Sequence, residues 1–194
     1  NRVMLRNRRI GCSVSGVAQF ITNRGLDEFR GWLENGYETI QNWDKVYSDW
    51  FAIPRSIKTT SVKPSGTVSL LAGATPGLHY PESRFYIRRI RLSVNSELIE
   101  PLKKAGYKIE PAFGSEDSTL VVEVPVDVGE GIRTAAELSI WEQFSLAAFL
   151  QRHWAGNQVS CTVTFDPEKE GAEIPNVLNY FQYHLKGISL LPRH

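Results

Sequence analysis

The chain has 194 residues, of which 42% are hydrophobic and 22% charged, so it carries enough apolar side chains for a packed core. Its 22 Lys and Arg nearly balance its 21 Asp and Glu, which excludes an overall basic field for a nucleic-acid backbone or an anionic membrane. Any anion site must therefore be local. No apolar run approaches the roughly 20 residues that cross a bilayer. Two cysteines and no apolar leader predict a cytoplasmic rather than a secreted protein.

Helical and strand patterns alternate in the first half of the chain. Apolar residues recur at steps of three, four or seven from Leu26 to Phe51, which predicts a helix that Gly36 and Asn42 divide and Pro54 ends. Residues 57–62 are β-branched and predict a strand. Residues 67–72 predict the start of a helix, and the turn formers in residues 73–81 predict a long loop.

The alternation continues in the second half. Strands are predicted at residues 85–92 and 120–124, a short helix at 97–105, and a longer helix from Leu138 to about His153. Strict alternation over residues 159–165 predicts a strand with one buried face. Residues 174–185 predict an amphipathic helix, and residues 188–191 the strand after it. This order favours an α/β architecture with largely parallel strands.

The segment Lys63-Pro64-Ser65-Gly66-Thr67-Val68-Ser69 lies between a predicted strand and a predicted helix. Glycine allows a ligand to approach the backbone, the first amides of a helix are unpaired, and three hydroxyl side chains add donors. Phosphate is the ligand that such a loop suits. The Gly-Lys-Ser/Thr ending of a Walker loop is absent. A capped helix start after a Pro-Gly turn explains the same residues without a ligand.

Other polar residues give weaker indications. Arg84, Arg88, Arg89 and Arg91 concentrate positive charge in one predicted strand, where anion binding is an alternative to the commoner solvated or paired face. The four histidines, at positions 79, 153, 184 and 194, lack the spacing of metal ligands, so no metal site is predicted. The histidine at position 79 lies in the glycine-rich loop and is interpreted as a loop residue with satisfied hydrogen bonds.

Both cysteines are interpreted as small buried hydrophobic residues. Cys161 falls on the apolar face of its predicted strand, and Cys12 is close to Val14, Val17 and Phe20. No catalytic set of Ser, His, Asp or Cys residues stands out. The residue patterns by themselves therefore predict an α/β domain with a candidate phosphate site and no catalytic residue.

Several stretches of sequence closely resemble one enzyme family. The segment Ile57-Lys58-Thr59-Thr60-Ser61-Val62-Lys63-Pro64-Ser65-Gly66-Thr67-Val68-Ser69-Leu70-Leu71-Ala72-Gly73 is the longest, and residues 6–11, 75–81, 87–91, 159–167 and 181–189 follow the same pattern. Together they resemble the monomeric, adenosylcobalamin-dependent (class II) ribonucleoside-triphosphate reductases along nearly the whole chain.

The resemblance implies a fold and a place within it. The fold is a ten-stranded α/β barrel made of two half-barrels around a catalytic finger loop. Residues 1–194 are expected to form a single segment, the C-terminal half of that barrel. The chain begins with Asn1, enters a basic segment from Arg2 to Arg9 and ends in strand-like sequence, which fits an internal piece of a longer polypeptide.

The resemblance also implies a reaction. In the family, adenosylcobalamin generates a cysteine thiyl radical that removes hydrogen from the ribose 3′ carbon. The 2′ hydroxyl then leaves as water, and a cysteine pair, recharged by a thioredoxin-like reductant, supplies the electrons. The products are deoxyribonucleoside triphosphates for DNA replication, made under allosteric control. The family's substrate-phosphate loop corresponds to Pro64, Ser65, Gly66, Thr67, Val68 and Ser69 here.

The chain departs from the family pattern at the radical centre. It contains neither the Asn-Pro-Cys finger loop nor the cysteines of the reducing pair and the C-terminal tail, so neither Cys12 nor Cys161 is given a radical role. The isolated segment is expected to be inactive. Two alternatives remain: a non-catalytic nucleotide- or phosphate-binding module, or a segment of a diiron or glycyl-radical reductase, which share the barrel.

Overall fold

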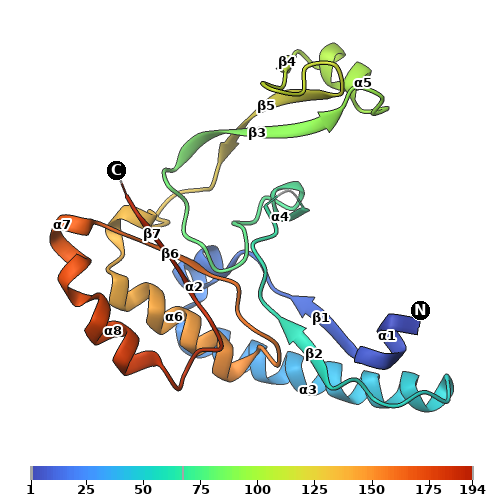
Figure 1. Ribbon diagram of the computed structural model, residues 1–194, viewed down its shortest axis with the longest axis vertical. Helices are drawn as coiled ribbons and strands as arrows, with labels where there is room; N and C mark the ends of the chain where they lie inside the picture. The colour runs from blue at the N-terminus through green and yellow to red at the C-terminus, as the bar shows by residue number, and fades with distance from the viewer. Residues whose placement is uncertain (1, 67, 194) are drawn as a thin grey trace. The chain divides into compact units, whose positions relative to one another are not determined.

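The computed structural model describes residues 2–66 and 68–193, and it divides into two compact units (Figure 1). The first unit combines the residues up to Pro81 with those from Gly131 onward, and the second unit is Glu82–Glu130. Neither boundary is marked by a linker-like composition in the sequence. The assignment of the whole chain to one barrel segment stays a prediction.

Parallel strands form the centre of the first unit. β1 (Arg9–Ser13) pairs with β2 (Lys58–Ser61), and β6 (Thr162–Phe165) pairs with β7 (Ser189–Pro192), both in parallel. A parallel bridge between Val62 and Val159 connects the two pairs, and the Ser160 amide donates to the Val62 carbonyl at 2.9 Å. The strands therefore follow one another in the order β1-β2-β6-β7.

Helices flank these strands. The first unit contains α1 (Arg2–Asn7), α2 (Val17–Arg24), α3 (Leu26–Trp50), α4 (Val68–Leu71), α6 (Ile140–His153), α7 (Pro167–Glu170) and α8 (Ile174–Phe181), with 3-10 turns at Ala135–Glu137 and Gly171–Glu173. Within the described ranges, no helix has the length and apolar character needed to cross a membrane.

The predicted division of the long helix is wrong. α3 runs without a break through Gly36 and Asn42. Gly36 faces the indole of Trp154, since a Cβ at Gly36 would lie 3.2 Å from Trp154 Cζ3. This close packing of α3 on Trp154 explains why a glycine is tolerated inside a continuous helix.

The hydrophobic core lies where α6 meets its neighbours. α6 and α8 run side by side (Figure 1), and the rings of Phe144 and Phe181 lie 5.5 Å apart. The N-terminus of α6 begins at Ser139, whose hydroxyl accepts from the Glu142 amide in a capping box. Gln143 connects the helix to β6, because its side-chain amide bonds both the carbonyl and the amide of Thr164. Fully buried members of the core include Phe144, Ile140, Leu150, Val17, Val62, Val159, Val163 and Val177.

Two predicted elements are shorter than expected. The predicted strand at 159–165 is regular only in β6, and Val159 contributes the isolated bridge. The predicted helix at 174–185 stops at Phe181, where the His184 amide bonds the Phe181 carbonyl in a turn. The apolar periodicity continues to Leu185 because that side chain still packs on the core.

The second unit is an antiparallel sheet. β3 (Phe85–Ser93), β5 (Thr119–Asp127) and β4 (Lys108–Pro111) lie in the order β3-β5-β4, and α5 (Ile99–Lys104) follows β3. The register runs from the Phe85–Asp127 pair to the Ser93–Thr119 pair. The expectation of largely parallel strands is therefore wrong for this unit. Only residues 112–118 connect β4 to β5, a length that suits a hairpin and is too short for a parallel crossover.

Candidate functional site

The loop predicted to bind phosphate follows β2 and leads into α4. The Gly66 amide donates to the Pro64 carbonyl at 2.8 Å, and the Ser69 amide donates to the Ser65 carbonyl at 3.2 Å. The Ser69 hydroxyl is buried and bonds the same Ser65 carbonyl. Two of the expected amide donors, and the Ser69 hydroxyl, are thus engaged in the loop's own turn. Val68 is exposed, and Thr67 lies outside the described residues.

The helix after this loop is only one turn long. α4 spans Val68–Leu71, and the amides of Ala72 and Ala74 both return to the Ser69 carbonyl. A single turn has too few aligned peptides to develop the dipole of a longer helix. The donors that a ligand would find here are therefore those of the loop, and the phosphate-binding role of Pro64 to Ser69 stays a prediction.

The loop of residues 73–81 packs directly against the candidate phosphate loop at Gly77. Gly77 has φ +56°, and a Cβ there would lie 2.7 Å from the Lys63 carbonyl oxygen. On its other side, the Gly77 carbonyl accepts from the Val17 amide at 3.4 Å, and its amide donates to the Ser15 hydroxyl at 3.3 Å. Gly77 thus lies between two segments: the residue just before the candidate loop, Lys63, and the N-terminus of α2.

Gln19 on α2 holds the first part of the same loop. Its side-chain nitrogen donates to the Gly73 carbonyl and its oxygen accepts from the Thr75 amide, both at 2.8 Å. The Gly16 amide donates to the Thr75 carbonyl at 2.8 Å. Neither α2 nor the bonds from Gln19 to the loop were predicted from the sequence, although Val17, Phe20 and Ile21 have helical spacing.

His79 connects the loop of residues 73–81 to the start of β6. Its Nδ1 lies 3.3 Å from the Pro76 carbonyl, and its Nε2 accepts from the Thr162 amide at 3.2 Å. These two bonds require a neutral ring with the proton on Nδ1. Burial lowers the pKa of His79, against a smaller opposing effect of the Pro76 carbonyl. The interpretation of His79 as a loop histidine with satisfied hydrogen bonds is confirmed.

A pocket of about 460 Å³ lies beside the loop of residues 73–81. Its lining includes Tyr80, Trp141 and Phe149. Arg133 pairs with Glu142 at 2.7 Å at the edge of this pocket. The hydrogen bond from Arg133 and the amide of Ser139 lower the pKa of Glu142 to about 2. Burial raises the pKa of the Tyr80 phenol, so Tyr80 is a neutral hydrogen-bonding group at neutral pH.

The two cysteines have different environments. Cys161 is buried, as predicted, and burial raises the pKa of its thiol to about 12. Cys12 is exposed, so its interpretation as a buried residue is wrong. All five residues of β1 are exposed. The apolar neighbours Val17 and Phe20 belong instead to α2 and pack elsewhere in the core.

Two of the four arginines predicted to concentrate charge, Arg84 and Arg89, have partners within the second unit. Arg84 pairs with Asp127 at 3.2 Å and Glu130 at 3.3 Å, and its guanidinium lies over the Phe85 ring. Arg89 pairs with Glu110. These contacts support the interpretation of Arg84 and Arg89 as paired surface residues. For the parts of the chain that the structure describes, no group of three or more His, Cys, Asp or Glu could hold a metal ion.

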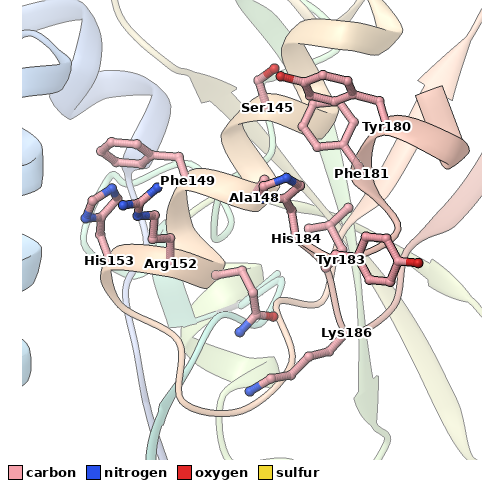
Figure 2. Close-up of a pocket in the computed structure, with 12 residues that line it drawn as sticks. Ser145, Ala148, Phe149, Arg152, His153, Tyr180, Phe181, Tyr183, His184 and Lys186 are labelled. Atoms are coloured by element: carbon pink, nitrogen blue, oxygen red, sulfur yellow. The ribbon is translucent and has the colours of Figure 1, made fainter. Parts of the chain in front are cut away.

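A pocket of about 580 Å³ lies between α6 and the segment that follows α8 (Figure 2). Figure 2 shows Phe149 and His153 on one side, Tyr180 and Phe181 at the top, and Tyr183 and Lys186 on the other side. The lining includes no residue of the loop at 64–69. This pocket is therefore separate from the predicted phosphate site, and no motif in the sequence predicted it.

A solved structure shares this fold. It is titled as the crystal structure of a B-12 dependent (class II) ribonucleotide reductase, and it matches with a TM-score of 0.81 and 33% identity. The match covers 100% of this chain and 31% of that chain. The mixed α/β fold is therefore that of a segment of a class II ribonucleotide reductase, and the predicted fold class is confirmed.

Relatives in sequence identify the family more closely. The chain is 61% identical to the adenosylcobalamin-dependent ribonucleoside-triphosphate reductase of Euglena gracilis, over 100% of this chain and 27% of the relative. It is also 61% identical to a probable reductase of that name from Dictyostelium discoideum, over 99% of this chain and 25% of the relative. The enzyme of that name from Levilactobacillus brevis is 37% identical over 98% of this chain and 29% of the relative. No protein-family model matches the chain.

The resemblance stated from the sequence is thereby confirmed: the chain is similar along its whole length to a segment of proteins named adenosylcobalamin-dependent ribonucleoside-triphosphate reductase. It spans about a quarter of the length of the relatives from Euglena and Dictyostelium, 27% and 25% respectively.

Proposed function

We propose that this chain is the C-terminal barrel segment of an adenosylcobalamin-dependent ribonucleotide reductase. The observation that carries this proposal is the 61% identity to a named reductase over the entire chain. The complete protein would be an oxidoreductase that converts ribonucleoside triphosphates to deoxyribonucleoside triphosphates by a thiyl-radical mechanism. A thioredoxin-like reductant, allosteric control, a cytoplasmic location and a role in supplying DNA replication belong to the same proposal.

Within that enzyme, this segment would hold the substrate phosphates with Pro64 to Ser69. The contact between Gly77 and the Lys63 carbonyl supports this role, because it fixes the backbone where the loop begins. Hydrogen bonds within the loop, from Gly66 to Pro64 and from Ser69 to Ser65, further limit its movement. A backbone that is fixed before the ligand arrives binds at a lower entropic cost. Ser65 supplies a hydroxyl donor for a phosphate oxygen.

The cofactor would supply the radical that starts the reaction. His79 and Cys161 do not fit as ligands of its cobalt. Both ring nitrogens of His79 are engaged in hydrogen bonds, and Cys161 is buried with a pKa of about 12. We therefore assign no cobalamin contact and no radical step to the described residues, and this segment's share of the chemistry is to position the substrate.

The test of the enzymatic proposal is an assay of the full-length protein. Deoxynucleotide formation from ribonucleoside triphosphates is expected with adenosylcobalamin and a dithiol reductant. Binding of triphosphate without product would favour the non-catalytic module. Turnover that proceeds only without adenosylcobalamin, with a diiron or glycyl-radical system, would assign the chain to another class of reductase.

A loop variant tests the proposed phosphate contact separately. Ser65→Ala removes a hydroxyl, and we expect it to weaken ribonucleoside-triphosphate binding by about 10- to 100-fold, the effect of one hydrogen bond to a charged group. Binding of the unphosphorylated nucleoside should not change. Ser96→Ala, in the second unit, is the matched control. Calorimetric titration that gave equal losses for triphosphate and nucleoside would contradict the role of Ser65.

A further inference from the structure

Two cationic residues face each other at the start of the β1–β2 pair. Arg9 is the first residue of β1, Lys58 is the first of β2, and the two are register partners. Because the strands are parallel, both residues lie at the N-terminal ends of their strands. Side chains at paired positions of neighbouring strands point to the same face of a sheet. The backbone therefore places the two charges next to each other.

A third cation reaches the same place from the segment before β7. The ammonium group of Lys186 donates to the Gly156 carbonyl. The side chain of Lys58 runs along the same glycine, since its Cδ lies 3.6 Å from the position of a Gly156 Cβ. The side chains of Lys58 and Lys186 therefore both approach Gly156, in the turn after α6.

Hydrogen bonds hold this turn to both strands. The Gly156 amide donates to the Thr60 hydroxyl at 2.8 Å, and the side-chain nitrogen of Asn157 donates to the carbonyls of Ile10 and Thr60, each at 2.9 Å. The turn is thus tied to β1 and to β2. Arg9 and Lys58 therefore stand on strands that this turn holds, and the Lys186 ammonium bonds the turn itself, as a preformed binding site requires.

The charges of the cluster are not compensated. Among residues 2–66 and 68–193, no carboxylate forms an ion pair with Arg9, Lys58 or Lys186. Burial, followed by the positive charges of Lys58 and Arg9, lowers the pKa of Lys186. Like charges held together repel, and a bound anion would relieve that repulsion.

The neighbouring pocket extends the basic character of this surface. Lys186 is also part of the pocket in Figure 2, together with Arg152, His153 and His184. The lining includes exposed aromatic rings, Tyr180 and Tyr183 among them, and it contains no Asp or Glu. The C-terminus of α6 attracts the Arg152 side chain, and His153 Nδ1 lies 2.8 Å from Glu34 Oε1, but neither interaction involves Arg9, Lys58 or Lys186.

We propose that Arg9, Lys58 and Lys186 bind the phosphate group of a small phosphorylated molecule. The guanidinium and the two ammonium groups offer donors to several oxygens of one phosphate. The site is distinct from the loop at Pro64, which follows the opposite end of β2. Pro64 is six positions beyond Lys58, roughly 20 Å of extended chain. This inference does not depend on the proposed function.

Calorimetric titration of the full-length protein with inorganic phosphate and with phenyl phosphate tests the site. We expect Lys58→Gln and Lys186→Gln each to weaken phosphate binding by about 10- to 100-fold, the effect of removing one charged donor. Lys45→Gln, an exposed lysine on α3, is the matched control and should bind as the unmodified protein does. Ser65→Ala should also leave this binding intact, which separates the cluster from the candidate substrate loop.

The two probes identify the source of the phosphate. Tighter binding of phenyl phosphate than of inorganic phosphate would support an aromatic ester whose ring enters the pocket of Figure 2, whereas equal binding would support the free ion. Arg9→Gln provides a third variant if either lysine variant fails to fold, as judged by circular dichroism. The proposal is overturned if phosphate binding does not saturate, or if the cluster variants bind as tightly as Lys45→Gln.

Discussion

Gly77 is a residue at which two backbone requirements coincide. Its φ of +56° is costly for any other residue, and a Cβ would come within 2.7 Å of the Lys63 carbonyl oxygen. We expect Gly77→Ala to lower the free energy of unfolding by about 2–4 kcal/mol, because the backbone carbonyl has to move. Denaturant unfolding of the purified protein measures this loss.

Gly73→Ala is the control for that measurement. Gly73 has a similar φ of +65°, but a Cβ there would meet nothing within 4 Å. Gly73→Ala should therefore lower the free energy of unfolding only by the cost of placing alanine in the left-handed conformation, about 1 kcal/mol. Equal losses at the two positions would show that the contact between Gly77 and Lys63 contributes nothing to stability.

Cys161 gives the folded protein a defined response to alkaline pH. Burial raises the pKa of its thiol from 9.0 to about 12. Below pH 9 the thiol is protonated in the folded and unfolded chains alike, and its contribution to stability is complete. From pH 9 to 12 only the unfolded chain loses the proton, so stability falls as the pH rises.

This response can be isolated by substitution. Between pH 8 and 10.5 the unmodified protein should lose up to about 2 kcal/mol more unfolding free energy than Cys161→Ala, at 1.36 kcal/mol per pH unit above the ordinary pKa. Identical pH profiles for the two proteins would rule out a buried, protonated thiol. Cys12, which is exposed, should react with thiol reagents at pH 8 without unfolding, whereas Cys161 should not.

The burial of individual residues was predicted correctly where a regular apolar period indicates which face of an element is buried. Strict alternation placed Cys161 on a buried face, and it is buried. Cys12 was judged by its apolar neighbours in sequence, which turn out to belong to a separate helix, α2. The partners of the candidate loop were not predictable, because the bonds from Gln19 to Gly73 and Thr75 join residues 54 and 56 positions apart.

At the scale of elements, α3 offers two glycines with different surroundings. Gly31 lies inside the helix with nothing within 4 Å of a Cβ, whereas a Cβ at Gly36 would lie 3.2 Å from Trp154. Gly31→Ala should therefore raise the free energy of unfolding by about 0.5–1 kcal/mol, the difference in helix propensity. Gly36→Ala should gain less, or lose stability, because the Trp154 indole has to shift. Thermal or denaturant unfolding compares them, and an equal gain at both positions would exclude the Trp154 contact as a constraint.

Long elements with a clear period were predictable, and several short ones were missed. α3, α6 and β3 extend over 25, 14 and 9 residues, and the sequence predicts each of them. α1, β4 and α7 have only four to six residues, too few to establish a period. Strand direction was missed for a different reason. Alternation shows which face of a strand is buried, but not whether its neighbour runs parallel or antiparallel.

At the scale of the whole molecule, the division into two units has no local sequence signal. The second unit, Glu82–Glu130, is inserted between Pro81 and Gly131 of the first. Its boundary depends on contacts within each unit, which become known only after folding. The candidate loop behaves similarly: its position between a strand and a helix turn was predicted, whereas its internal hydrogen bonds were not.

The C-terminal half of α3 exposes a connected aromatic surface in the described chain. The rings of Trp43 and Tyr47 lie 5.3 Å apart, those of Tyr47 and Trp50 lie 5.4 Å apart, and the three residues are 50%, 47% and 70% exposed. Connected apolar surface of this kind favours association in water. We therefore expect the 194-residue chain to self-associate at micromolar concentrations.

A paired substitution tests whether this surface is responsible. Trp43→Gln with Trp50→Gln should weaken self-association at least tenfold, as measured by sedimentation velocity over a range of concentrations, because most of the aromatic area is removed. Phe113→Gln is the control: Phe113 is 94% exposed in the second unit, and single exposed apolar residues are common on soluble proteins. If the control reduced association as much as the paired variant, association would reflect general apolar exposure rather than the aromatic surface of α3.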